Sequence, residues 1–298
     1  RHTFFYPAEQ YDEEILNMLG QLTTFGMGEV EIHLHHQNDT AENMRKTIMN
    51  LKEILHGKHG LLGEDNNKNV RYGFIHGNWA LCNSLPEGEW CGVNEEIIVL
   101  TETGCYADFT FPSAPSPSQP RMVNSIYRAI NIEGQPRSHD YGNIVIKGLR
   151  GGGKGLMIIE GPLAFNWEKR KWKILPSIEN SEISAGNVIS TERIDLWVRQ
   201  NITVSGKSEW VFVKVHMHGA LPENTDVLLE KEMKKMHLYL QEKYNEGEKW
   251  KLHYVSAREM YNIIRAAEDG CEGSPGEYRN YEIKPPPIVG KTQNNYCG

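Results

Sequence analysis

The chain has 298 residues, of which 39% are hydrophobic and 24% are charged. These proportions are typical of a globular protein and exclude a disordered, collagen-like or coiled-coil chain. The formal net charge of −7 excludes the basic footprint that general nucleic-acid binding requires, and no apolar run approaches the roughly 18 residues of a membrane-spanning helix.

Cysteine usage and the first residues of the chain support two further expectations. The five cysteines form no Cys-x-x-Cys zinc motif, and their odd number argues against a disulfide framework. This usage favours a cytoplasmic protein, although nothing in the sequence fixes the compartment. The chain begins inside a strand-like run, Arg1 to Tyr6, with no initiator methionine or signal peptide, so we expect part of the protein to lie upstream.

Apolar residues recur with alternating strand and helix periods along the chain. In chain order, the expected elements are a strand at 2–6, a helix at 12–22, a strand at 29–35, a helix at 40–55, a strand at 71–76, a helix at 95–103, strands at 105–110 and 156–160, a helix at 191–201, a strand at 210–216, a helix at 225–244, a strand at 250–255 and a helix at 257–267. Strands that alternate with helices indicate a parallel sheet. This pattern predicts an α/β fold, a distorted (β/α)7–8 barrel that lacks its first strand in this chain.

Two segments fall outside this alternation. Residues 112–155 contain several prolines and a glycine run, so we expect a loop excursion over the active site that contributes no strand to the barrel. Residues 269–298 are rich in Pro and Gly and are expected to form a peripheral tail. The domain prediction is therefore a single catalytic barrel over residues 1–268.

Histidines gather at the predicted C-terminal ends of strands, where β/α barrels place their active sites. His33 and His35 end one strand, His76 ends the next, and His216 and His218 end a later one. Because residues i and i+2 share a face of a strand, each His-x-His pair presents two imidazoles in one direction. Converging imidazoles favour Zn²⁺ or a similar divalent metal.

Acidic residues at the same ends complete the candidate chemistry. Asp39, four residues past His35, can add an oxygen ligand, which makes His33, His35 and Asp39 the expected metal set. Asp108 and Glu160 stand at the ends of two later strands and can act as acid, base or ligand. The alternative for each of these two carboxylates alone is a helix cap or a salt bridge.

Residues beside the strand ends suggest how a substrate would be held. We expect His76, Asn78 and Trp79, which lie together where one strand ends, to bind substrate. The indole ring of Trp79 suits stacking on a sugar, with plain packing as the alternative. A lysine inside a barrel strand is costly to bury unless it meets a carboxylate or a substrate. We therefore expect Lys214 to line one polar pocket with the second His-x-His pair, opposite the first pair.

Short motifs near both ends of the chain occur in the order of a known family. His2-Thr3-Phe4-Phe5, then Glu31-Ile32-His33-Leu34-His35 and Asp39-Thr40, are similar to two early strands of that family. Val213-Lys214-Val215-His216 and Val255-Ser256-Ala257-Arg258-Glu259-Met260 are similar to its late strand and closing helix. Together these motifs resemble the polysaccharide deacetylases, in particular the chitin deacetylase-like enzymes. The Arg-x-Pro motif of that family is not found here, and residues 72–79 occupy its position.

The resemblance implies a metal-dependent hydrolase that removes acetyl groups from a polysaccharide or oligosaccharide, with Zn²⁺ as the expected metal. It places the metal on His35 and Asp39, with His33 as a further candidate and an aspartate from an upstream strand. His216 or His218 would then protonate the leaving group or stabilise the oxyanion.

Three alternatives stay open on the sequence alone. A glycoside hydrolase of the same barrel superfamily would use Asp108 and Glu160 as its carboxylate pair. An amidohydrolase-like barrel would hold its metal with both His-x-His pairs. A carbohydrate-binding homologue without catalytic activity is the non-enzyme interpretation. Release of acetate, release of sugar, or release of neither distinguishes these functions.

Overall fold

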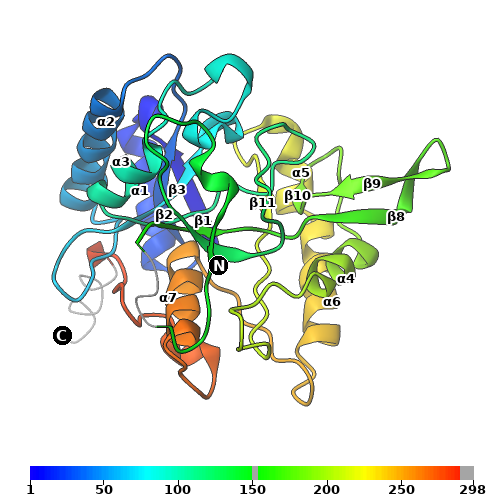
Figure 1. Ribbon diagram of the computed structural model, residues 1–298. Helices are drawn as coiled ribbons and strands as arrows, with labels where there is room; N and C mark the ends of the chain where they lie inside the picture. Colours follow the sequence, from blue (N-terminus) through cyan, green and yellow to red (C-terminus); the bar gives the residue numbers. More distant parts are fainter. Residues whose placement is uncertain (150–153, 289–298) are drawn as a thin grey trace, which may run out of the picture.

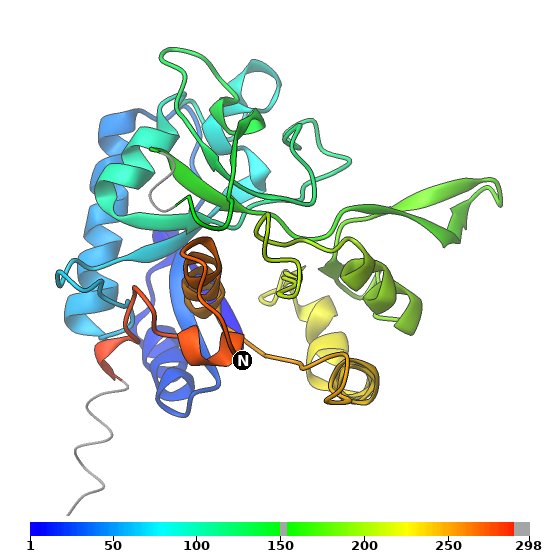
Figure 2. The ribbon, with the colours of Figure 1, turned by 60° about the horizontal axis from the view of Figure 1, so that its bottom comes forward.

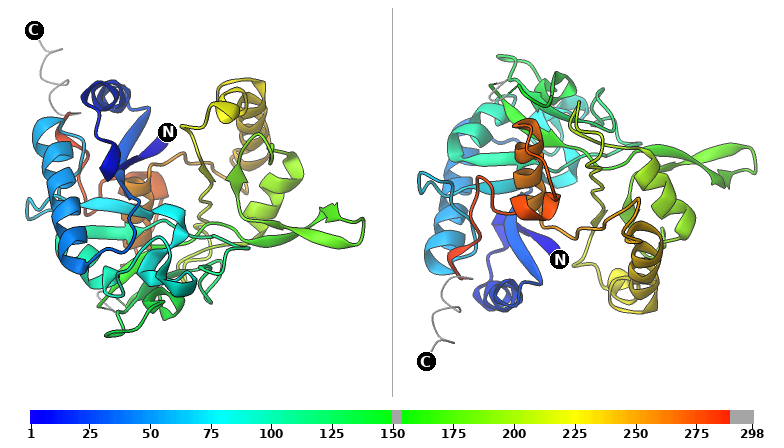
Figure 3. Two further views of the ribbon diagram at one scale, coloured as in Figure 1. Left: turned by 90° about the horizontal axis from the view of Figure 1, so that it is seen from above. Right: turned by 90° about the horizontal axis from the view of Figure 1, so that it is seen from below.

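The computed structural model describes residues 1–149 and 154–288 of the chain. It is a mixed α/β structure built around one large, mostly parallel sheet (Figure 1). We call the part around this sheet the sheet lobe. A smaller group of helices and short strands, formed mainly by residues 164–199 and 216–250, lies beside it and is called the helical lobe (Figure 3).

The large sheet has seven strands within the described residues. They are β1 (His2–Pro7), β2 (Gly28–Leu34), β3 (Tyr72–His76), β4 (Cys105–Asp108), β5 (Ile126–Ala129), β6 (Gly142–Ile144) and β7 (Leu156–Ile159). They pair in the order β1-β2-β3-β4-β7-β5-β6. Strands β1, β2, β3, β4 and β7 pair in parallel, so their C-terminal ends lie along one edge of the sheet. β5 then pairs antiparallel with β7, and β6 pairs antiparallel with β5.

Helices connect the parallel strands and form most of the helical lobe. The sheet lobe contains α1 (Glu13–Thr24), α2 (Ala41–Glu53), α3 (Glu96–Thr103) and α7 (Ala257–Glu268), and the helical lobe contains α4 (Thr191–Arg199), α5 (Thr225–Leu229) and α6 (Lys231–Tyr244). Capping chemistry sets several helix starts. Asp12 and Thr40 accept backbone N–H groups at α1 and α2, and Ser256 forms a capping box with Glu259 at α7.

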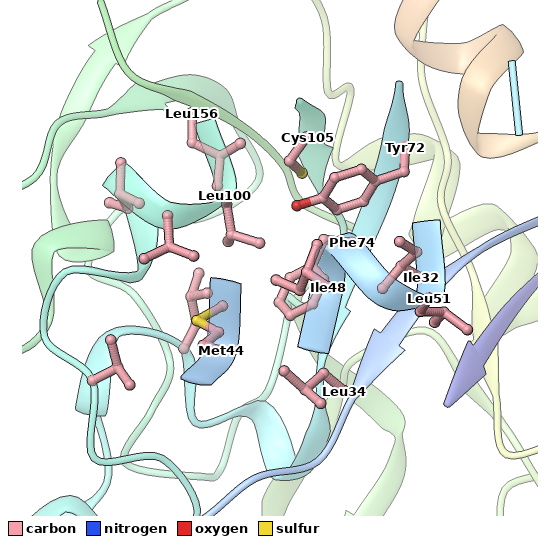
Figure 4. Close-up of a cluster of buried hydrophobic side chains, with 14 of the residues drawn as sticks. Ile32, Leu34, Met44, Ile48, Leu51, Tyr72, Phe74, Leu100, Cys105 and Leu156 are labelled. Atoms are coloured by element: carbon pink, nitrogen blue, oxygen red, sulfur yellow. The ribbon is translucent and has the colours of Figure 1, made fainter. Parts of the chain in front are cut away.

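One face of the large sheet is covered by α1, α2 and α3. The apolar stripe of α2, formed by Met44, Ile48 and Leu51, packs in one core with Ile32 of β2 and Phe74 of β3 (Figure 4). Burial of each such side chain is worth about 1.5–3 kcal/mol. This core therefore fixes the positions of β2 and β3, whose C-terminal ends carry the histidines.

The other face of the sheet packs against α7. Leu156 and Ile158 of β7 lie in the first core, whereas Met157 and Ile159 lie in a second core with Ile264 of α7. This alternation follows from the period of two along a strand. A strand that is buried on both faces reads as a continuous apolar run, which is typical of parallel sheets.

The helical lobe has a small core of its own. Its strands are β8 (Ala164–Lys171) and β9 (Leu175–Glu179), which form an antiparallel hairpin, and β10 (Glu182–Ile183), which pairs with β11 (His216–Met217). Ile194 and Trp197 of α4 pack with Met236 and Tyr244 of α6. The hairpin projects away from the body of the molecule (Figure 2).

Residues 112–155 are not entirely loop. β5 and β6 lie in this segment and extend the sheet beyond β7, so the prediction of an excursion without sheet strands is wrong. The prolines of the segment fall outside both strands, where a missing N–H group costs no ladder hydrogen bond. Residues 150–153, which hold the glycine run, lie outside the described residues.

The predicted strands at 210–216 and 250–255 are wrong, apart from the short β11. The apolar pattern of the first segment has a different cause. Trp210 and Phe212 pack in the core beside α7, whereas Val213 packs against the core of the helical lobe. The second segment also divides its apolar residues between these two cores. Both segments are apolar on two sides because they lie between two cores.

The segment after α7 packs against the sheet lobe. Ile283 is buried, and the side chain of Asn262 in α7 binds its backbone N–H and C=O groups at 2.9 and 2.8 Å. Most of residues 269–288 are exposed or half-buried, and Ile283 anchors this segment to α7; residues 289–298 lie outside the described part. In the described ranges, no helix has the length and apolar character needed to cross a membrane.

Candidate metal centre

The C-terminal edge of the parallel sheet gathers the polar residues expected at strand ends. His33 lies at the end of β2, His76 ends β3, Asp108 ends β4, and Glu160 directly follows β7. Because these four strands are neighbours and parallel, the side chains lie along one edge of the sheet, as the sequence predicts. Two groups of histidines stand on this edge, one buried and one exposed.

The buried group joins β2, β3 and α3. His36 Nε2 lies 2.8 Å from His76 Nε2, and each of these nitrogens lies 3.2 Å from Oε1 of Glu96. The thiol of Cys91 is close by, since the ligand atoms of all four residues lie within 4.8 Å of one another. We call these four residues the buried centre. Their donor atoms are those of a group that could hold a metal ion.

The second ring nitrogen of each histidine fixes its tautomer. His76 Nδ1 lies 2.6 Å from the carbonyl oxygen of Gly77, which can only accept, so this nitrogen carries the hydrogen. His36 Nδ1 lies 2.8 Å from Oδ2 of Asp39 and donates to that carboxylate. In their neutral forms, the two imidazoles therefore direct Nε2 lone pairs at each other. This contact is repulsive unless a proton or a metal ion lies between the nitrogens.

Glu96 supplies negative charge to the buried centre. The residue is fully buried, and its Oε1 has no hydrogen-bond partner among the described residues. Burial raises the pKa of Glu96, but the charges of His76 and His36, each 3.2 Å from Oε1, outweigh burial and hold this pKa well below its usual value. Burial lowers the pKa of His36, but Glu96 and Asp39 outweigh burial and raise it. Without a metal, the centre therefore favours a protonated His36 beside an ionised Glu96.

The loop between β3 and α3 brings His76, Cys91 and Glu96 together. Six of its non-glycine residues have positive φ angles, namely Asn78, Trp79, Cys82, Asn83, Glu87 and Trp90. Such conformations cost energy and persist only where the surrounding structure holds them. The backbone N–H groups of Asn83 and Val93 each donate to Cys91 Sγ at 3.3 Å. The backbone of the loop therefore surrounds the Cys91 sulfur.

The expected metal set of His33, His35 and Asp39 does not assemble. His33 and His35 share a face, as strand parity predicts, and their Nε2 atoms lie 3.2 Å apart. Asp39 is wrong as the third ligand, because its carboxylate binds His36 Nδ1 and the backbone N–H of Thr40 at 2.7 Å. The turn into α2 places this carboxylate behind a ligand of the buried centre.

His33 and His35 form a second group, which we call the exposed pair. His33 Nδ1 donates to the carbonyl oxygen of Ile75 at 2.8 Å, and His35 Nδ1 lies 2.5 Å from Oε1 of Glu9. The two Nε2 atoms again face each other. The His35 side chain is 41% exposed, whereas that of His36 is 6% exposed. The pair therefore reaches solvent through His35, with His33 half-buried beside it, whereas the buried centre is closed to solvent.

Asp108 and Glu160 are buried around Lys214. The ammonium group of Lys214 donates to the carbonyl oxygens of Phe109 and Phe111. Burial lowers the pKa of Lys214 and raises that of Asp108, and each shift is opposed by the charge of the other residue. Burial also raises the pKa of Glu160 to about 8. The charges of Asp108 and Glu160 thus act on Lys214, and this arrangement suits a buried charge cluster better than a glycosidase pair facing a sugar.

His216 and His218 differ in their surroundings. Burial and the charge of Lys214 lower the pKa of His216 to about 3, so its ring is neutral at pH 7 and a poor proton donor. His218 is exposed, and its ring meets Trp79 edge-on with 6.0 Å between centroids. Asn78 is exposed beside Trp79. Of the two histidines, His218 is therefore the more exposed one.

Sequence spacing gives no ligand role to His36, Cys91 or Glu96. It assigns His76 to substrate binding, which is wrong because this ring is buried against His36. No local motif signals the buried centre, because its members come from three separate segments that only the fold brings together. The available signal was the excess of histidines at strand ends.

Comparisons of the chain with protein-family models, with curated proteins and with solved structures found no match. The resemblance to deacetylases therefore rests on the short motifs alone.

Proposed function

We propose that the protein is a metal-dependent hydrolase that removes acetyl groups from a polysaccharide or oligosaccharide. In this proposal the fold is a divergent β/α barrel, and the reaction takes place at the exposed pair on its C-terminal edge. The observation that carries the proposal is the pair of facing Nε2 atoms, 3.2 Å apart, on a solvent-open part of that edge. Zn²⁺ is the proposed metal, because imidazole ligands suit it.

The surroundings of the exposed pair suit metal binding. The Ile75 carbonyl and the Glu9 carboxylate each bind one Nδ1 atom, which directs both Nε2 lone pairs to the same place. Glu9 also accepts the backbone N–H of His35 at 3.3 Å. Catalytic zinc sites usually have three protein ligands, and the resemblance implies an aspartate from an upstream strand as the third.

A divalent metal at this position would polarise the acetyl carbonyl and lower the pKa of its bound water. The His35 ring packs against Gly77, where any side chain would collide with it, so the exposed pair adjoins the loop that carries Asn78 and Trp79. In this proposal Trp79 would stack on a sugar ring, and His218, whose ring contacts Trp79, would protonate the leaving group.

Acetate release tests this proposal directly. The protein is incubated with acetylated chito-oligosaccharide or acetylated xylan, with added Zn²⁺ or with a chelator, and both free acetate and new reducing ends are measured. His33→Ala and His35→Ala should each lower acetate release by about 10²-fold or more. His237→Ala, which changes an exposed histidine on α6, is the matched control and should leave activity unchanged.

The two products separate the competing functions. Reducing ends without acetate would favour a glycoside hydrolase that uses Asp108 and Glu160. Binding of the oligosaccharide with neither product would identify a carbohydrate-binding protein. Acetate release that survives both histidine substitutions would refute the assignment to the exposed pair.

A further inference from the structure

We propose that the buried centre is a second, closed zinc site, which holds the loop between β3 and α3 in place. His36, His76, Cys91 and Glu96 are its four ligands. The proposal goes beyond the hydrolase function and does not depend on it, because the buried centre shares no ligand with the exposed pair and needs no substrate.

Three of the ligand atoms already form one face of a tetrahedron. Zn–N and Zn–O bonds of about 2.0–2.2 Å place neighbouring ligands about 3.3–3.6 Å apart in a regular tetrahedron. The observed separations are 2.8 Å between the two Nε2 atoms and 3.2 Å from each of them to Oε1 of Glu96. Side-chain shifts of roughly 0.5 Å bring these atoms to ligand distance.

The hydrogen bonds outside the buried centre orient its ligands. Asp39 holds Nδ1 of His36 and the Gly77 carbonyl holds Nδ1 of His76, which is the usual arrangement behind metal-binding histidines. Oε1 of Glu96 lies near both Nε2 atoms without hydrogen-bond geometry to either. A shared proton would satisfy the two imidazoles but would leave this buried oxygen unpaired, whereas a metal ion satisfies all three atoms.

Cys91 is placed to supply the fourth ligand. Its Sγ accepts N–H groups from Asn83 and Val93 at 3.3 Å, and these bonds hold the sulfur beside the other three ligand atoms. Sγ also lies 3.4 Å from Oε2 of Glu96. On metal binding, the thiol proton leaves to solvent, and a Zn–S bond replaces the contact between the thiol and the carboxylate.

Charge balance and ligand type both indicate Zn²⁺. One thiolate and one carboxylate neutralise a divalent ion, and the two neutral imidazoles add no charge. A neutral centre suits a place where His76, Cys91 and Glu96 are fully buried. Thiolate and imidazole ligands favour Zn²⁺ over Mg²⁺ and Ca²⁺, which prefer oxygen ligands.

Burial and ligand number indicate a structural role for this metal. Four protein ligands leave no open position for water or substrate, which is the mark of a structural zinc site. Three of the ligands flank or belong to the loop with six positive φ angles, and the Cys82 backbone N–H donates to Glu96 itself. Metal binding would thus offset the conformational energy of these positive φ angles and fix the position of Trp79 at the sheet edge.

Metal retention and cobalt spectroscopy test the proposal. The full chain is loaded with Zn²⁺, loosely bound metal is removed by brief chelation, and the remaining metal is measured by mass spectrometry. We expect one retained Zn²⁺ per chain and a lower Tm after prolonged chelation. Co²⁺ in its place should give a sulfur-to-cobalt charge-transfer band. Cys91→Ser should abolish this band and weaken metal binding by about tenfold or more.

Cys105→Ser is the matched control, because Cys105 is a buried cysteine on β4 outside the buried centre. This variant should keep both the metal and the cobalt band. The proposal is overturned if the loaded protein retains no metal, if Cys91→Ser keeps the band, or if chelation leaves the Tm unchanged. A variant with both His33→Ala and His35→Ala should keep the band while it loses hydrolysis, so failure of either proposal can be told from failure of the other.

Discussion

Replacement of Arg258 by Met should strongly destabilise the sheet lobe. Arg258 lies on α7 with its side chain 2% exposed, and its guanidinium donates to both carboxylate oxygens of Glu29 at 2.9 and 2.7 Å. The same group donates to the carbonyl oxygens of Arg279 and Ile283 and to the side chain of Asn280. This one side chain therefore joins β2, α7 and the segment that follows α7.

The size of the effect follows from what Arg258→Met leaves behind. Glu29 remains buried, with the Ser256 hydroxyl still donating to it at 2.8 Å. Loss of one partner of a buried ion pair typically costs about 3–5 kcal/mol, because the remaining charge is uncompensated. The double variant Glu29→Gln, Arg258→Met removes that charge as well, so it should be more stable than Arg258→Met alone.

Urea unfolding followed by circular dichroism at pH 7 measures these free energies. Arg45→Met provides the control, because Arg45 pairs with Glu102 on the surface, with side chains 40% and 55% exposed. Such a pair is worth about 0–1 kcal/mol. The reasoning is refuted if Arg258→Met loses less than about 1 kcal/mol, or if the double variant is no more stable than the single one.

Three further predictions concern the sheet and its edge. Burial raises the pKa of Glu31 to about 8, so the folded protein keeps a proton that the unfolded chain releases near pH 4.5. The free energy of unfolding should therefore fall as the pH rises from 5 to 8. Glu31→Gln should flatten this pH dependence, as measured by urea unfolding at each pH. Gly73→Ala should cost about 1–3 kcal/mol, because the added Cβ would lie 2.7 Å from the Tyr106 hydroxyl oxygen, and an unchanged Tm would contradict this. Trp79→Ala should raise KM for an acetylated oligosaccharide about five- to tenfold through loss of a stacking contact. If kcat falls while KM stays constant, Trp79 does not bind the sugar.

Much of the sheet could be predicted because most of its parallel strands are buried on both faces. β1 to β4 and β7 each coincide with a predicted apolar run, and α7 with a predicted helix. β5 and β6 were missed because they are only four and three residues long and lie among prolines. The run at 210–215 shows the opposite error, since burial between two cores produces the same apolar pattern as a central strand.

Within the candidate site, only the residues on or beside strands could be placed from the sequence. The period of two correctly placed His33 and His35 together, because both stand on or beside β2. Asp39 lies beyond the strand, where the start of α2 decides its direction, and its carboxylate binds His36 instead of joining the exposed pair. Cys91 and Glu96 reach the centre through a loop with no periodicity, so no spacing rule could have found them.

Adjacent histidines with the same chemistry thus face two environments, and burial separates their roles. His35 turns to the exposed side of the sheet edge, where a bound metal would keep positions for water and substrate. His36, one residue later, turns inward to His76 and Glu96, where four protein ligands leave no such position. Substitutions at His35 should therefore lower activity at constant stability. Substitutions at His36 should lower stability and metal retention first, and activity only through the position of Trp79.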